Sequence, residues 1–149
     1  MLDLTKCIIH SMSIKDLDEI KNNLETDFDD FWNYKIFKEE LANTNSKYLV
    51  LRYDNKIVAF GGFKTIFHEA DLMNIVTKKS ERNKGFAGFL LYQLIDYAKD
   101  LQCKIITLEV NENNKPAICL YKKYDFKQAG LRKGYYRNGD NAILMTLKI

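Results

Sequence analysis

A basic, glycine-containing loop joins an apolar strand to an amphipathic helix within residues 74–101. Apolar residues of the helical part recur three or four positions apart, which is typical of a helix that buries one face. They are Phe86, Leu90, Leu94, Ala98 and Leu101. A second apolar, strand-like run follows at residues 104–111. A strand–helix–strand unit of this length predicts that its two strands are parallel, because antiparallel neighbours need no such crossover.

The loop before the helix is suited to an anionic ligand. Gly85 lets the backbone turn sharply and lets a ligand come close to the main-chain amides. The helix start adds unpaired N–H groups and the positive end of a dipole, so a pyrophosphate fits here. A plain tight turn explains the same residues equally well. Neither GxxxxGK[ST] nor GxGxxG occurs in the segment, which excludes a P-loop and disfavours a Rossmann unit.

Length and composition predict one globular domain spanning residues 1–149. The chain is 46% hydrophobic and 29% charged, which is ordinary for a folded protein with a sizeable core. Its net charge is +3, without a long basic run that contains aromatic residues, so we expect no direct nucleic-acid partner. No apolar run reaches the ~20 residues of a membrane span. With no signal-peptide pattern either, we expect a cytoplasmic protein without a membrane partner.

The cysteine and histidine residues do not predict a metal site. Three cysteines and two histidines fall at spacings that match no zinc cluster. We therefore expect no metal, and we expect Cys7 and Cys103 to be reduced core residues.

The remaining segments complete an α/β chain. Ser13 has the position of a helix N-cap, with Asp16 three residues later, and Asp54-Asn55 predicts a hairpin turn. The Gly61-Gly62 pair predicts a bulge or a close backbone approach. Strands are expected at residues 4–12, 47–53, 56–67, 69–77, 104–111, 126–137 and 142–149, helices after Ser13 and at 33–43, 86–101 and 115–124, and a turn at 25–32.

Two sequence motifs resemble those of the GNAT (general N-acetyltransferase) superfamily. The pattern Arg82-x-x-Gly85-x-Ala87 resembles its acetyl-coenzyme A motif, [QR]xxGx[GA]. The run that begins Leu108-Glu109-Val110 and continues through Asn114, Ala117, Leu120-Tyr121 and Phe126 resembles the LEVR-x-x-N-x-x-A-x-x-LYE-x-x-GF signature of its bacterial ribosomal-protein-alanine N-acetyltransferases (RimI). The sequence departs from that signature at Asn111, Lys122 and Asp125, and Lys78-Lys79 replaces an Asp-Pro.

The resemblance implies a fold and a cosubstrate. The fold is a single-domain GNAT fold: a mixed, mostly antiparallel sheet of about seven strands with a parallel, splayed central pair and about four helices. The cosubstrate is acetyl-coenzyme A, and the oligomeric state is a monomer or a homodimer. The coenzyme is expected to contact the strand end Ile75, Val76 and Thr77, the loop residues Arg82, Asn83, Lys84, Gly85, Phe86, Ala87 and Gly88, and also Asn114 and Tyr121.

The resemblance also implies roles in the reaction. Glu109 is the candidate base for the acceptor amine, with Glu69 as its competitor, and Tyr121 is the candidate acid for the leaving thiolate. Each of these residues has a purely structural alternative, such as a solvated strand-end carboxylate or a core tyrosine. The substrate-binding candidates are Asn74, Tyr135 and Tyr136.

Three functions remain open at this stage. The first is acetylation of a protein N-terminal α-amine, with a ribosomal protein as the partner implied by the resemblance. The second is acetylation of a lysine side chain or a polyamine, which the acidic residues at positions 25–30 leave open. The third is a coenzyme-binding regulatory protein without turnover; the presence of both Glu109 and Tyr121 argues against it.

Overall fold

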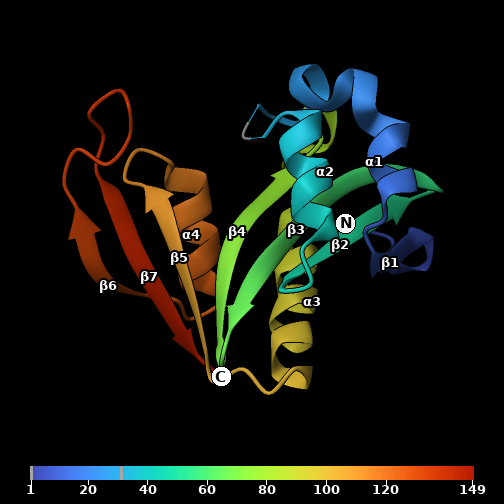
Figure 1. The fold of residues 1–149 in the computed structure, drawn as a ribbon. Helices are drawn as coiled ribbons and strands as arrows, with labels where there is room; N and C mark the ends of the chain where they lie inside the picture. Colours follow the sequence, from blue (N-terminus) through green and yellow to red (C-terminus); the bar gives the residue numbers. More distant parts are fainter. Residues whose placement is uncertain (1, 31) are drawn as a thin grey trace. The chain divides into compact units, whose positions relative to one another are not determined.

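A computed structural model describes residues 2–30 and 32–149 of the chain (Figure 1). These residues form a seven-stranded sheet with the hydrogen-bonded order β1-β2-β3-β4-β5-β7-β6, together with four α-helices. The strands are β1 (Cys7–Ser11), β2 (Ser46–Tyr53), β3 (Lys56–Ile66), β4 (Glu69–Thr77), β5 (Ile105–Asn111), β6 (Lys127–Arg132) and β7 (Ala142–Lys148). The helices are α1 (Ile14–Ile20), α2 (Tyr34–Ala42), α3 (Phe86–Asp100) and α4 (Lys115–Lys123).

The chain divides into two compact units. The first consists of residues 1–64 and 73–94, and the second of residues 65–72 and 95–149. Strand β4 and helix α3 each contribute to both units.

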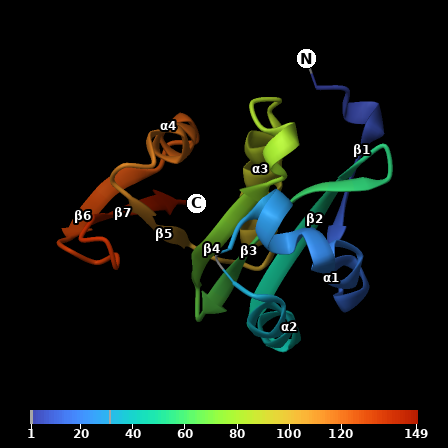
Figure 2. The same ribbon diagram turned by 90° about the horizontal axis from the view of Figure 1, so that it is seen from above.

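In the first unit, α1 and α2 cover one face of the strands and the beginning of α3 covers the other (Figure 2). Tyr48 and Phe60 from the strands share a buried cluster with Leu17 of α1 and Phe37 of α2. Side chains alternate between the two faces along each strand. The ring of Tyr53 in β2 faces α3 and lies 5.2 Å from that of Phe86 at the start of this helix.

Local signals in the sequence explain where these elements begin and turn. Ser13 and Asp16 form a reciprocal capping box at the start of α1. Asp54 and Asn55 have φ values of 52° and 66°, which are typical of the two-residue hairpin turn predicted for them. At Gly62, an added Cβ would lie 2.5 Å from the Lys47 carbonyl oxygen, so the predicted close backbone approach is confirmed.

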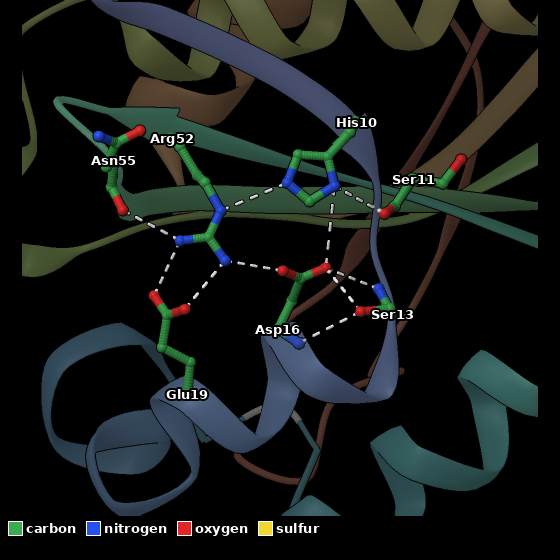
Figure 3. Close-up of polar contacts among 7 residues, drawn as sticks. All are labelled: His10, Ser11, Ser13, Asp16, Glu19, Arg52 and Asn55. Atoms are coloured by element: carbon green, nitrogen blue, oxygen red, sulfur yellow. Dashed lines mark hydrogen bonds and ion pairs between the residues drawn. The ribbon is translucent and has the colours of Figure 1, made fainter.

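A polar network fixes α1 to the strands (Figure 3). Arg52 of β2 holds Glu19 through two hydrogen bonds of 3.0 and 2.9 Å and donates to Asp16 Oδ1 at 2.8 Å. His10 of β1 accepts from Arg52 Nε at 3.3 Å, and the Ser13 amide donates to Asp16 Oδ2 at 2.8 Å. Both carboxylate oxygens of Asp16 thus accept hydrogen bonds, which compensates for the burial of this residue, only 5% of which is exposed.

The second unit contains the parallel strand pair. The β4 residues Glu69 and Asp71 pair with Ile105 and Thr107 of β5 in parallel register, which confirms the predicted crossover. Strands β5, β7 and β6 then pair antiparallel, with a register shift between Gln128 and Gly130. In α4, Asn114 is the N-cap, and the helix begins at Lys115.

Three expected elements differ from the structure. The first strand begins at Cys7 rather than Leu4, because residues 4–6 form a 3-10 turn capped by Asp3. The prediction of a turn at 25–32 was wrong at its start, because Leu24–Phe28 forms one π-helical turn. Its first and last residues, Leu24 and Phe28, are both buried. Strand β6 ends at Arg132, and residues 133–141 form a long loop. Phe31 lies outside the described residues.

Candidate active site

The loop that leads into α3 contains two residues with left-handed backbone conformation. Asn83 and Gly85 have φ values of 64° and 93°, which reverse the chain just before the helix. The Phe89 N–H donates to the Gly85 carbonyl oxygen at 3.1 Å and so makes the first helical hydrogen bond. The amides of Phe86, Ala87 and Gly88 precede that bond and are therefore available to a ligand at the helix start.

The side chains of this loop are partly engaged within the first unit. Arg82 Nη2 donates to the Phe28 carbonyl oxygen at 3.4 Å, and Lys84 Nζ lies 2.9 Å from Glu81 Oε2. Phe86 is 2% exposed. A cavity of about 540 Å³ borders this loop and is lined by Leu2, Tyr53, Glu81, Asn83, Lys84 and Phe86.

The end of β4 in the first unit carries three further residues that were expected to contact the cosubstrate. Val76 is buried, whereas Ile75 and Thr77 are half-buried. Among the described residues, the Asn74 side-chain oxygen is buried and has no hydrogen-bond donor. Gly61 of β3 allows the backbones to approach, since an added Cβ there would lie 2.9 Å from the Asn74 carbonyl oxygen.

In the second unit, Glu109 lies at the centre of a polar cluster. It occupies an exposed position on β5 between the buried residues Leu108 and Val110. Arg132 Nε lies 3.3 Å from Glu109 Oε1. A hydrogen bond with Glu109 raises the pKa of Tyr135. The carboxylate of Glu109 therefore has both a cationic and a phenolic partner.

Tyr121 of α4 is connected electrostatically to the same cluster. Burial, together with the nearby Tyr136, raises the pKa of Tyr121 to about 12. Burial and then the charge of Glu109 raise the pKa of Tyr136 as well, and the rings of Tyr135 and Tyr136 meet edge to face at 5.2 Å. Tyr121 therefore keeps its phenolic proton at neutral pH, as a proton donor must.

The strand register separates the two candidate bases. Glu69 pairs with Ile105, four residues before Glu109 on β5. At about 3.3 Å per residue, this offset places Glu69 roughly 13 Å from Glu109 along the strand direction. The carboxylate nearer to the cluster is Asp71, whose charge also raises the pKa of Tyr135 and which accepts from Thr107 Oγ1 at 3.2 Å.

The loop that carries Tyr135 and Tyr136 is attached to the end of β5. Asn111 Nδ2 donates to Asp140 Oδ2 at 3.0 Å, and the Tyr136 amide donates to the Asp140 carbonyl oxygen at 3.1 Å. Asn141 Nδ2 donates to Glu112 Oε2 at 3.2 Å. These contacts attach the loop to the end of β5, although residues 133–141 have no regular secondary structure.

The described residues suggest neither a metal centre nor a membrane span. No group of three or more His, Cys, Asp or Glu side chains within residues 2–30 and 32–149 could hold an ion. No helix in that part of the chain is long and apolar enough to cross a bilayer.

Comparisons with known proteins identify the family. Residues 16–126 match the acetyltransferase (GNAT) family. The chain belongs to the GNAT family. It is therefore an acyltransferase of the N-acetyltransferase type, as its GNAT-like sequence motifs predict.

GNAT relatives match most of the chain. A Salmonella typhimurium protein named [ribosomal protein bS18]-alanine N-acetyltransferase is 32% identical over 123 residues, covering 79% of this chain and 81% of the relative. An N-alpha-acetyltransferase from Saccharolobus solfataricus is 29% identical over 151 residues, covering 93% and 90%. The crystal structure of the ribosomal-protein-S18-alanine N-acetyltransferase from Escherichia coli matches with a TM-score of 0.87 and 29% identity, covering 96% of this chain and 94% of that one.

Within this GNAT fold, the structure brings some expected site residues together and reveals others. Glu109, Tyr121, Tyr135 and Tyr136 are linked in the second unit, whereas Glu69 is at the other end of β5. Sequence reasoning missed Arg132, whose partner is 23 positions away in the sequence. The two residues meet across strand pairings that no local sequence pattern specifies.

Proposed function

We propose that this GNAT enzyme transfers the acetyl group of acetyl-coenzyme A to the α-amine of a protein N-terminus. The observation that carries the proposal is the linked set of Glu109, Tyr135, Tyr136 and Tyr121. It supplies a carboxylate and a protonated phenol on one unit of the fold. The names of the two relatives, an alanine N-acetyltransferase and an N-alpha-acetyltransferase, support the same acceptor class.

The cosubstrate is assigned to the α3 loop and the end of β4. The amides of Gly85, Phe86, Ala87 and Gly88 would bind the pyrophosphate, because they stand at the positive end of a helix. Arg82, Asn83 and Lys84 border that position. Main-chain groups of Ile75, Val76 and Thr77, together with Asn114, would align the pantetheine arm, and a strand N–H would stabilise the tetrahedral oxyanion.

Glu109 is assigned as the base that activates the acceptor. An α-amine with a pKa of about 7.7–8.0 is mostly protonated at pH 7 and must lose a proton before it can attack. A carboxylate on the exposed side of β5 can take that proton directly or through water. The neutral nitrogen then attacks the thioester carbonyl and forms a tetrahedral intermediate. As this intermediate collapses, the nitrogen gives up a further proton, the C–S bond breaks, and the sulfur leaves as a thiolate that takes up a proton to give the thiol.

Tyr121 is assigned as the donor to the leaving sulfur. Its pKa of about 12 keeps the proton in place throughout the physiological range. Complete transfer to a free thiolate, whose ordinary pKa is about 8.5, is uphill. We therefore expect Tyr121 to act mainly as a hydrogen-bond donor to the sulfur while the C–S bond is breaking.

Asn74, Tyr135 and Tyr136 are assigned to the acceptor peptide. We propose an N-terminal alanine of a ribosomal protein as the acceptor, in line with the name of the Salmonella relative. Such an acceptor places the reaction in the cytoplasm. Acetylation of a lysine side chain or a polyamine is the alternative that the acceptor assay must separate from this one.

The test compares three acceptors under identical conditions. They are a peptide that starts with alanine, the same peptide with a blocked N-terminus and an internal lysine, and spermidine. Thiol release measures turnover, and fragment mass spectrometry locates the acetyl group. Acetylation of the free alanine α-amine alone is the expected result. Turnover only with lysine or spermidine would contradict the proposed acceptor.

A further inference from the structure

We propose that Arg132 is a positioning residue that holds Glu109 in the orientation needed to deprotonate the acceptor amine. This inference rests on the proposed function, because it acts through the base assigned there. It is based on three residues that contact one another pairwise. Arg132 touches Glu109, Glu109 is hydrogen-bonded to Tyr135, and Tyr135 lies against the Arg132 guanidinium.

The strand register shows how Arg132 reaches Glu109. Glu109 lies on β5 and Arg132 on β6, with β7 between them. Arg132 pairs with Ala142 of β7, and Glu109 pairs with Leu144, two positions further along. The arginine side chain must therefore cross β7 diagonally, and it does so beside a residue that has only a methyl group.

A glycine on β6 keeps the neighbouring position small as well. Gly130 pairs with Leu144, and an added Cβ at Gly130 would lie 3.0 Å from the Leu144 Cδ1 atom. That distance is shorter than an ordinary contact, so a larger residue would move Leu144. The diagonal from Arg132 to Glu109 thus passes between Ala142 and Leu144 of β7, and Gly130 leaves room for the Leu144 side chain.

The contacts of Glu109 leave it able to accept a proton. Arg132 Nε lies 3.3 Å from Glu109 Oε1, and Tyr135 is hydrogen-bonded to the same carboxylate. A carboxylate has about four lone-pair sites, and we assign one of those that remain to the acceptor ammonium. The guanidinium Cζ lies 5.6 Å from the Tyr135 ring centre, so a cation–π contact with the ring helps to hold the arginine beside Glu109.

Stability does not account for this ion pair. The Arg132 side chain is 55% exposed, and exposed ion pairs contribute little to folding free energy. The exposure also means that replacing Arg132 should leave the fold intact. A role in orienting the base accounts for an arginine here, because its planar guanidinium can contact Glu109 while lying over the Tyr135 ring, whereas a lysine ammonium on a flexible stem is oriented less well.

The test measures steady-state kinetics of Arg132→Gln, Arg132→Lys and the control Arg137→Gln, with the alanine-starting peptide as acceptor. Arg137 is an exposed arginine in the loop that follows β6, so its substitution makes the same change of charge. We expect Arg132→Gln to lower kcat about tenfold while the coenzyme Kd and the thermal unfolding midpoint stay unchanged. Arg132→Lys should recover part of the loss, and Arg137→Gln should match the wild type.

A double-mutant cycle shows whether Arg132 acts through Glu109. In a Glu109→Gln background, Arg132→Gln should cause no further loss of kcat, because the oriented group is already gone. Wild-type kcat in Arg132→Gln, or losses that multiply in the double variant, would overturn the positioning role. A wild-type enzyme that acetylates no α-amine would overturn the proposed function instead, so the two failures are distinguishable.

Discussion

Asn111 donates a 3.0 Å hydrogen bond to Asp140 and so connects the end of β5 to the loop that carries Tyr135 and Tyr136. Asn138 donates to the same carboxylate oxygen at 2.9 Å. Hydrogen bonds from Asn111, Asn113 and Asn138 hold the pKa of Asp140 below its ordinary value. Asn111 is one of the positions at which the sequence departs from the RimI signature, and the structure gives the departure a local function.

Replacing Asn111 should therefore weaken acceptor binding rather than coenzyme binding. In Asn111→Ala we expect the acceptor KM to rise about three- to tenfold, because the tyrosine loop loses its attachment to β5. The coenzyme Kd, measured by calorimetry, should not change. Gln128→Ala, an exposed change on β6, is the control. An Asn111→Ala enzyme with wild-type KM would show that the loop does not depend on this bond.

Removing the Tyr121 hydroxyl should slow the reaction without weakening coenzyme binding. We expect kcat of Tyr121→Phe to fall about 10²- to 10³-fold, the usual cost of removing one positioned hydrogen-bond donor to developing negative charge. A spectrophotometric titration should show one tyrosine fewer ionising near pH 12, since burial raises the pKa of Tyr121 to about 12. A Tyr121→Phe enzyme with wild-type kcat would remove Tyr121 from the mechanism.

Gly85→Ala should weaken coenzyme binding. Its φ of 93° is unfavourable for an L-residue, so the loop has to change shape around the amides that we assign to the pyrophosphate. We expect the coenzyme Kd to rise about tenfold. Gly139→Ala is a matched control, because Gly139 has a φ of 91° and equally open surroundings. Equal coenzyme Kd values in the two variants would contradict the assignment of the loop.

Asp16 should make stability depend on pH in the acid range. Burial opposes ionisation, but hydrogen bonds from the Ser13 backbone and Arg52 outweigh it and hold the pKa of Asp16 below the ordinary value of 3.8. A carboxyl group with a lowered folded pKa contributes stability that is complete above its unfolded pKa and is lost as pH falls through the folded value.

Asp16→Asn should therefore be destabilised by about 1–3 kcal/mol at neutral pH. That deficit should shrink below pH 3.8, as the wild-type carboxylate becomes protonated. Urea unfolding at several pH values measures both effects. Asp100→Asn, at the exposed end of α3, should stay within about 0.5 kcal/mol of the wild type. A deficit of constant size down to pH 2 would contradict the account of Asp16.

The sequence predicted those parts of the fold that depend on local patterns. The Ser13 capping box and the Asp54-Asn55 turn are short-range signals, and both are confirmed. The π-helical turn at Leu24–Phe28 was not predicted, because acidic residues between the two buried side chains resemble a solvated turn.

The candidate site was less predictable for a different reason. Glu109 and Tyr121 belong to a contiguous sequence motif, whereas the ion pair from Arg132 and the bond from Asn111 to Asp140 join residues on different strands and loops. Such contacts depend on register and on the path of residues 133–141. Periodicity and spacing do not specify either of these.

The most direct test of the proposed activity is fragment mass spectrometry of an alanine-starting peptide after incubation with the enzyme and acetyl-coenzyme A. The account predicts one added acetyl group on the α-nitrogen of the alanine, and little of it when Glu109→Gln replaces the wild type. An unmodified α-amine, with acetyl groups only on lysine side chains or none at all, would contradict it.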